Sequence, residues 1–217
     1  RVLAHISGDE YMIEAFNSDA DIHTNTAAQV FNMPALYVTP EMRRKAKAVN
    51  FGIVYGIGAF SLSQDIGVSV AEADRYIKNY LDTFSGVKKY MEDTVTFAQE
   101  NGYIETLYGR RRALPEISSS NKNIVNFGKR VAMNTPIQGT AADIIKIAMI
   151  RVYRRLKKEQ LDARLILQVH DELIVEAPQH EVEQVKALLQ EEMQAAAKLK
   201  VLLKADVGTG KTWYDAK

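Results

Sequence analysis

The sequence contains no cysteine, only 5 prolines in 217 residues, and one tryptophan. The absence of cysteine excludes a disulfide framework, a thiolate metal site and a cysteine nucleophile. Redox chemistry at protein thiols is therefore excluded as well. With 47% hydrophobic and 25% charged residues, the composition is that of an ordinary globular protein with a substantial core.

Long apolar runs are also missing. Stretches such as residues 144–145 and 165–167 are interrupted by polar residues long before they reach the length that spans a bilayer, and the N-terminus has no signal-peptide pattern. We therefore expect a soluble, cytoplasmic protein with no membrane partner. Because the sequence starts at Arg1 and runs directly into apolar residues, we also expect it to be a segment of a longer polypeptide.

Charge of either sign is nearly balanced, at a formal net charge of +1, but it is unevenly distributed. The region from Asp171 to Glu192 is mainly acidic, whereas cations gather in clusters elsewhere. Such a pattern fits a polyanion held beside a metal-binding carboxylate, although each cluster taken singly is also typical of a solvated helix face. For residues 154–158 we favour the solvated face. The basic clusters lie at residues 43–47, 110–112, 129–130 and 151–158.

Hydrophobic periodicity predicts successive helices in residues 1–100. The third has the clearest start, since Thr39 can cap it and Pro40 occupies the first turn, where a missing N–H costs nothing. Gly56 and Gly58 fit its end. The predicted helices cover residues 2–16, 22–31, 40–55, 70–84 and 87–100.

The pattern changes in the second half of the chain. Residues 103–115 predict a short hairpin or extended loop, and a long helix is expected over residues 124–158, broken or bent near Pro136 and Gly139. Strand-like runs follow at residues 164–169 and 172–176, and we expect a hairpin with His170 and Asp171 at its turn. A helix over 181–199 and a strand over 201–207 complete an α+β class.

Four residues of the helix from Pro40 recur at a spacing of four, so that they form one stripe on a single face. The stripe joins two cations, Arg43 and Lys47, to two aromatic residues, Phe51 and Tyr55. A triphosphate suits the cations, and a sugar and base suit the aromatic rings. Spacing alone supports equally a helix whose aromatic residues lie in the core and whose cations are solvated.

The predicted turn at residues 168–173 places two carboxylates after an imidazole. A hard divalent cation binds such oxygen ligands, and phosphoryl transfer with two metals uses carboxylates that bridge the ions. Strand alternation makes Asp171 the better metal ligand and Glu172 a lesser candidate. Taken alone, the dipeptide His170-Asp171 more often reflects turn chemistry.

A third stretch, residues 130–143, combines a cation and amides with small residues. Asn134 and Gln138 lie one helical turn apart, and Arg130 precedes them by another turn. Side-chain amides can bind the minor-groove acceptors that all base pairs share. Ordinary helix packing is the simpler interpretation of this stretch on its own.

Together these motifs resemble family A DNA polymerases of the bacterial polymerase I type. Residues 43–56, RRKAKAVNFGIVYG, resemble motif B of the family, and residues 168–172, QVHDE, resemble motif C. Residues 1–7, 21–24 and 135–143 resemble further family segments in the same order. The resemblance covers the whole chain.

The resemblance implies a role for each motif residue. Arg43, Lys47 and His23 would bind the triphosphate of a dNTP, with Phe51 at its sugar and Tyr55 at the templating position. Asp171, Lys47 and Arg43 would be the catalytic residues, Asp171 as a ligand of Mg²⁺ and Lys47 also as a cation or acid for the leaving pyrophosphate. The residues implied to contact primer-template DNA are Arg130, Asn134, Gln138 and His170.

The resemblance also implies a division into a helical fingers part, residues 1–115, and part of a palm, residues 116–217, in a monomeric parent that uses two Mg²⁺ ions. The family's motif A, with the second metal-binding aspartate and a glutamate for sugar selection, has no counterpart in these 217 residues. We therefore expect the chain alone to be inactive.

Two alternatives stay open at this point. A single-subunit RNA polymerase shares the layout of these motifs, although Phe51 and the Asp171-Glu172 pair resemble the DNA enzymes more closely. A non-catalytic nucleic-acid-binding module descended from a polymerase is the other.

Overall fold

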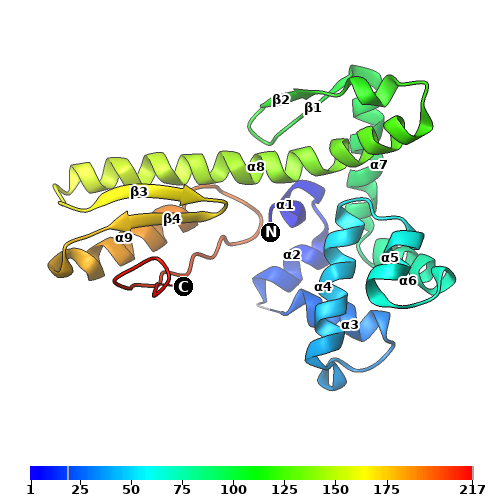
Figure 1. The fold of residues 1–217 in the computed structure, drawn as a ribbon, viewed down its shortest axis with the longest axis horizontal. Helices are drawn as coiled ribbons and strands as arrows, with labels where there is room; N and C mark the ends of the chain where they lie inside the picture. The colour runs from blue at the N-terminus through cyan, green and yellow to red at the C-terminus, as the bar shows by residue number, and fades with distance from the viewer. Residues whose placement is uncertain (19, 217) are drawn as a thin grey trace. The chain divides into compact units, whose positions relative to one another are not determined.

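The computed structural model describes residues 1–18 and 20–216, including all of their side chains except those of residues 29 and 30. It divides into two compact units, residues 1–138 and 139–217. The described residues are mostly helical, and each unit contains one small two-stranded antiparallel sheet (Figure 1). The predicted α+β class is confirmed. The units meet in sequence inside a helix, and the division into fingers and palm near residue 115 stays a prediction.

Helices dominate the first unit. The predicted helix from Pro40 is confirmed as α4 (Pro40–Val54), where the Thr39 hydroxyl accepts a hydrogen bond from Met42 N and Pro40 lies in the first turn. The expected helices near 22–31, 70–84 and 87–100 are confirmed within two residues at each end. They are α3 (Ile22–Val30), α6 (Val70–Thr83) and α7 (Ser85–Asn101).

Two predictions for this unit were wrong. The single helix expected over residues 2–16 is two helices, α1 (Val2–Ser7) and α2 (Glu10–Asn17), because Gly8 adopts a left-handed conformation with φ 63° and ends the first. The short helix α5 (Ala59–Ile66) was not predicted at all. The 3-10 helix η1 (Ala35–Tyr37) precedes α4.

The buried carboxylate of Asp9 joins the start of the chain to α7. One of its oxygens accepts from Met12 N at 2.9 Å and caps α2, while the other accepts from Gly86 N at 2.8 Å. Asp9 is only 4% exposed, so these hydrogen bonds compensate for its lost hydration. A Cβ added to Gly86 would lie 2.7 Å from the Cα of Asp9, so the two backbones are in close contact.

The expected hairpin after α7 is also confirmed. Strands β1 (Tyr103–Glu105) and β2 (Arg111–Ala113) pair antiparallel, and the 3-10 helix η2 (Pro115–Ser118) follows. Apolar residues of this segment pack against α7 and the first half of α8 (Lys122–Lys158). The buried cluster consists of Ala98, Ile104, Leu114, Ile117 and Ala132.

Helix α8 is one continuous element from Lys122 to Lys158, so Pro136 and Gly139 do not break it, and a bend at these residues stays a prediction. A proline removes one backbone hydrogen bond of a helix, and in a helix of 37 residues the flanking turns keep the ladder intact. The Thr135 hydroxyl donates an additional hydrogen bond to Val131 O at 2.7 Å just before the proline.

The second unit packs two strands and a helix on the C-terminal part of α8. The predicted hairpin is confirmed, with β3 (Arg164–Val169) antiparallel to β4 (Glu172–Glu176) and Val169 opposite Glu172. The 3-10 helix η3 (Gln179–Glu181) and α9 (Val182–Gln194) follow. The core is formed by Val152, Leu156, Ala163, Val185, Leu188 and Leu189.

The strand predicted over residues 201–207 was wrong, because this segment forms no ladder with any strand that the structure describes. Two of its apolar residues nevertheless pack inside the protein: Val201 is 2% exposed, and Val207 packs on the core of the second unit. The Gln190 side chain donates to Ala205 O at 3.2 Å. The alternation of apolar and polar residues in this segment therefore reflects the packing of an irregular segment and not a strand.

Helix α9 also ends at Gln194, five residues before the predicted end.

Among the residues that the structure describes, no helix combines the length and apolar character needed to cross a bilayer.

The contact between Asp9 and Gly86 provides a test of the first unit. We predict that Gly86→Ala lowers the free energy of unfolding by about 1–3 kcal/mol, since the added methyl group must displace backbone. Ser85→Ala, at the exposed neighbouring position, is the matched control and should change stability by less than about 0.5 kcal/mol. Urea unfolding followed by circular dichroism measures both, and equal midpoints for the two variants would contradict the account.

Candidate functional site

Helix α4 has two distinct faces. Its inner face buries Ala46, Val49, Asn50 and Ile53. On the outer face, Phe51 is 47% exposed and Tyr55 is 41% exposed, and both cations of the predicted stripe are exposed as well. The interpretation in which these aromatic residues belong to the core is therefore wrong. Because the two exposed rings lie next to each other and beside Lys47, the outer face is a candidate binding surface.

The four stripe residues form a continuous surface, here called the α4 stripe (Arg43, Lys47, Phe51 and Tyr55). Lys47 Nζ lies 5.9 Å from the centroid of the Phe51 ring, and the rings of Phe51 and Tyr55 stack at 6.3 Å with an interplanar angle of 27°. The ring of His23, from α3, lies 6.0 Å from that of Phe51. The α4 stripe thus grades from cations to aromatic rings along one line, with the imidazole beside it.

Arg43 is held by a carboxylate from the segment before α3. Its Nε donates to Asp21 Oδ2 at 2.5 Å, and its Nη2 donates to Oδ1 at 3.3 Å. The hydrogen bond from Arg43 keeps the pKa of the Asp21 carboxyl well below its usual range. This contribution to stability is complete above the ordinary pKa of Asp and is lost as the pH falls below it, because the folded state then binds fewer protons than the unfolded state.

His23 is oriented by the buried amide of Asn50, a contact that was not predicted from the sequence. Asn50, which is 8% exposed, places its Nδ2 2.8 Å from His23 Nδ1 and its Oδ1 3.0 Å from the Thr26 hydroxyl. With the amide in this orientation, Nδ2 donates to Nδ1, so the proton of the neutral imidazole lies on Nε2. An asparagine on the apolar face of a helix was the available signal, since a buried amide requires partners.

Electrostatics at this position favour the neutral imidazole. Burial lowers the pKa of His23 below its ordinary value, and the positive charges of Arg43 and Lys47 lower it further against the opposing effect of Asp21. A neutral ring that carries its proton on Nε2 is a hydrogen-bond donor without a charge.

The third sequence stretch lies against the end of α4. Gly56 has φ +73°, and a Cβ there would lie 2.8 Å from Met133 Cε and 3.0 Å from Arg130 Cγ. The glycine therefore allows close contact between the end of α4 and α8, which brings Arg130 next to the stripe. Arg130 and Gln138 are exposed, whereas the Oδ1 of Asn134 is buried with no hydrogen-bond partner among the described atoms.

In the second unit, the predicted turn is confirmed at His170 and Asp171. His170 adopts a left-handed conformation with φ 52°, and the Gln168 side chain donates to its carbonyl oxygen at 2.7 Å. Both side chains of the turn are exposed. Glu172 begins β4 and accepts a hydrogen bond from Trp213 Nε1 at 3.2 Å. This contact with Trp213 was not predicted. A local sequence pattern could not indicate it, because the two residues are 41 positions apart in the sequence.

These carboxylates suit a hard divalent cation by their chemistry but not by their number. Asp171 and Glu172 supply oxygen ligands, which Mg²⁺ prefers. In the part of the chain that the structure describes, however, no three histidine or acidic side chains are grouped to hold an ion. The hairpin therefore fits part of a magnesium site, and the remaining ligands would come from substrate phosphates, water or another polypeptide segment.

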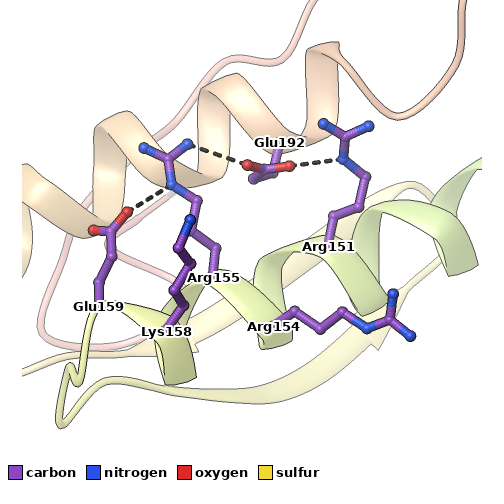
Figure 2. A pocket seen from close by; sticks show the side chains of 6 residues that line it. All are labelled: Arg151, Arg154, Arg155, Lys158, Glu159 and Glu192. Atoms are coloured by element: carbon purple, nitrogen blue, oxygen red, sulfur yellow. Dashed lines mark hydrogen bonds and ion pairs between the residues drawn. The ribbon is translucent and has the colours of Figure 1, made fainter.

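The basic cluster at residues 151–158 has a structural role that the prediction of a solvated face understated. Figure 2 shows Arg151 and Arg155 of α8 directed at Glu192 of α9. Arg151 Nε lies 2.7 Å from Glu192 Oε2, and Arg155 also pairs with Glu159 at 2.7 Å. These arginines join α8 to α9, so their charge is neutralised within the protein. Arg154 and Lys158 are exposed, as predicted.

Comparison with known proteins gives the family. The sequence profile described as DNA polymerase family A matches residues 1–215. The chain belongs to DNA polymerase family A. Two relatives are DNA polymerase I of Bacillus subtilis strain 168 and of Bacillus caldotenax, 58% and 56% identical to this family A chain over 217 residues. The chain spans about a quarter of the length of each, since it covers 25% of both.

A solved structure gives the same result for the fold of this family A chain. The POL domain of Pol1 from M. smegmatis, in complex with DNA primer-template and dNTP, superposes with a TM-score of 0.94 at 44% identity. The match covers 99% of this chain and 38% of that one. The family resemblance read from motifs B and C is therefore confirmed.

The hydrogen bond between Asn50 and His23 provides a second test. We predict that Asn50→Asp raises the pKa of His23 relative to that in the unsubstituted protein, since a carboxylate in contact with the ring stabilises the imidazolium. Titration of the ring nitrogens by ¹⁵N NMR measures this pKa, and the Nε2–H tautomer should be seen in the unsubstituted protein. The shifts of His180, in the other compact unit, should not change. A pKa of His23 that does not rise in the variant would refute the contact with residue 50.

Proposed function

We propose that this chain forms the nucleotide-binding and part of the metal-binding surface of a complete DNA polymerase. The activity is template-directed DNA synthesis, in which a primer 3′-hydroxyl attacks the α-phosphate of a dNTP. The new bond joins the 3′-oxygen to that phosphorus, and the bond to the β-phosphate breaks to release pyrophosphate. The family membership supports this proposal, as does the neighbour whose title names primer-template and dNTP.

The observation that carries the proposal is the exposed α4 stripe. A dNTP is anionic at one end and flat at the other, and the stripe presents Arg43 and Lys47 at one end and the rings of Phe51 and Tyr55 at the other. Arg43 offers a planar fork to phosphate oxygens, and Lys47 offers a compact charge. We assign His23, with its proton on Nε2, as a neutral donor to the same phosphates.

The remaining residues receive roles in the same proposal. Asp171 holds Mg²⁺ in a site that the complete polymerase finishes, with Glu172 as a lesser ligand, and two ions polarise the attacking and leaving oxygens when bound. Lys47 neutralises or protonates the leaving pyrophosphate. Primer-template DNA is contacted by Arg130, Asn134, Gln138 and His170.

The identity to DNA polymerases over the whole chain disfavours the RNA polymerase alternative. The non-catalytic binding module is distinguished by experiment. We predict that Asp171→Asn in the complete polymerase lowers the rate of dNTP incorporation by about 10³-fold or more, because a metal-binding carboxylate becomes a neutral amide. The Kd for primer-template, measured by fluorescence anisotropy, should stay within about twofold.

Asp162→Asn, at an exposed aspartate before β3, is the matched control and should leave the rate unchanged. An unchanged rate for Asp171→Asn would instead indicate that the hairpin serves binding alone.

The 217-residue chain by itself should not polymerise. The reason is the incomplete metal site, since no three-ligand group exists among the described residues. Primer extension with the purified chain, alongside the complete polymerase at equal concentration, measures this. Templated incorporation by a preparation free of host polymerase would contradict the prediction.

A further inference from the structure

The guanidinium of Arg43 is engaged along one of its two hydrogen-bonding edges. Nε and Nη2 both donate to Asp21, to its Oδ2 at 2.5 Å and to its Oδ1 at 3.3 Å. This is the side-on arrangement of an arginine–carboxylate pair, in which two parallel N–H groups meet two oxygens. The Arg43 side chain is 46% exposed, and its contact is with the segment before α3, not with its own helix.

Asp21 is itself fixed in place. Its Oδ1 accepts from His23 N at 3.1 Å, and its Oδ2 accepts from the Thr24 hydroxyl at 2.8 Å. These donors belong to the first turn of α3, where backbone N–H groups have no partners within the helix. The carboxylate therefore cannot follow Arg43 as a flexible surface pair would, and it acts as an anchor built into the helix start.

Guanidinium carries five N–H donors in one plane, arranged on two bidentate edges. Asp21 uses the edge formed by Nε and Nη2, so that the edge formed by Nη1 and Nη2 points away from the carboxylate. An anion bound at that end meets a fork whose orientation is already set. An arginine that is fixed before binding loses less side-chain entropy when the ligand arrives.

We infer that Asp21 is a positioning residue for Arg43, which it holds side-on so that the end of the guanidinium is presented to the phosphates of the nucleotide. This inference rests on the proposed function, in which Arg43 binds the triphosphate. It goes further because Asp21, which does not touch the nucleotide, then contributes to the affinity for dNTP through Arg43. Asp21 also carries a negative charge near the proposed position of the phosphates. If it competed with them for Arg43, its removal would strengthen dNTP binding instead of weakening it.

The test uses the complete polymerase with primer-template and measures the apparent Kd for dNTP in single-turnover kinetics. Asp21→Asn keeps an oxygen that can cap α3 but removes the bidentate pair. We expect it to weaken dNTP binding about fivefold, with the maximal rate nearly unchanged. In the Arg43→Ala background the same substitution should have no further effect, because there is no guanidinium left to position.

Glu41→Gln is the matched control. It removes an i,i+4 pair with Lys45 on the same helix, where the two charges lie 3.5 Å apart. Its dNTP affinity should be that of the unsubstituted enzyme.

The outcomes distinguish the positioning role of Asp21 from the proposed triphosphate contact of Arg43. Equal or tighter dNTP binding by Asp21→Asn overturns the positioning role and favours Asp21 as a competitor. An effect that persists undiminished in the Arg43→Ala background overturns it as well, since Asp21 then acts by another route. If Arg43→Ala itself binds dNTP normally, the proposed triphosphate contact fails and the positioning role fails with it. Weaker binding by both single variants, without addition in the double variant, supports both.

Discussion

The burial of one face of α4 is the constraint on which the first unit depends. Val49 and Ile53 are almost fully buried, and Asn50 lies among them with both ends of its amide engaged. The regular repeat of 3.6 residues per turn fixes the directions of all side chains around the helix axis relative to one another. When one face of the helix is packed, the direction of the opposite face is therefore fixed as well. The exposure of Phe51 and Tyr55 is thus a consequence of packing on the opposite side.

The same buried face controls the chemistry of the outer face. Asn50 belongs to the packed side of α4, yet its Nδ2 lies 2.8 Å from Nδ1 of His23, whose ring lies beside that of the exposed Phe51. Asp21 caps α3 and also holds Arg43. In both cases a residue needed for local structure orients a residue of the surface. By contrast, Arg151 and Arg155 pair with acidic residues of α9 and contribute to packing.

Local signals predicted much of this fold. The start of α4 was readable because Thr39 and Pro40 have preferences that do not depend on tertiary context, and the β3–β4 hairpin was readable from two apolar runs around a turn. The failures have physical causes. Gly8 ends a helix that periodicity alone continued, and residues 201–207 bury apolar side chains without a strand partner. A single proline did not break α8.

In the candidate site, the spacing of residues along one helix identified the members of the α4 stripe. The same spacing could not predict contacts between segments that are far apart in the sequence. Asp21 and Arg43 are 22 residues apart, and Asn50 and His23 are 27 apart. The pairing of such residues is decided by how α3 packs on α4, which a periodic pattern does not encode. Whether Phe51 and Tyr55 are exposed or buried could not be predicted for the same reason.

In the proposed function, the α4 stripe receives the incoming nucleotide with its phosphates at Arg43 and Lys47. The most direct measurement is a crystal structure of the complete polymerase with primer-template and an unreactive dNTP analogue. We expect phosphate oxygens within hydrogen-bond distance of both cations, and the sugar and base against Phe51 and Tyr55. A triphosphate bound away from α4, with the stripe still facing solvent, would contradict it.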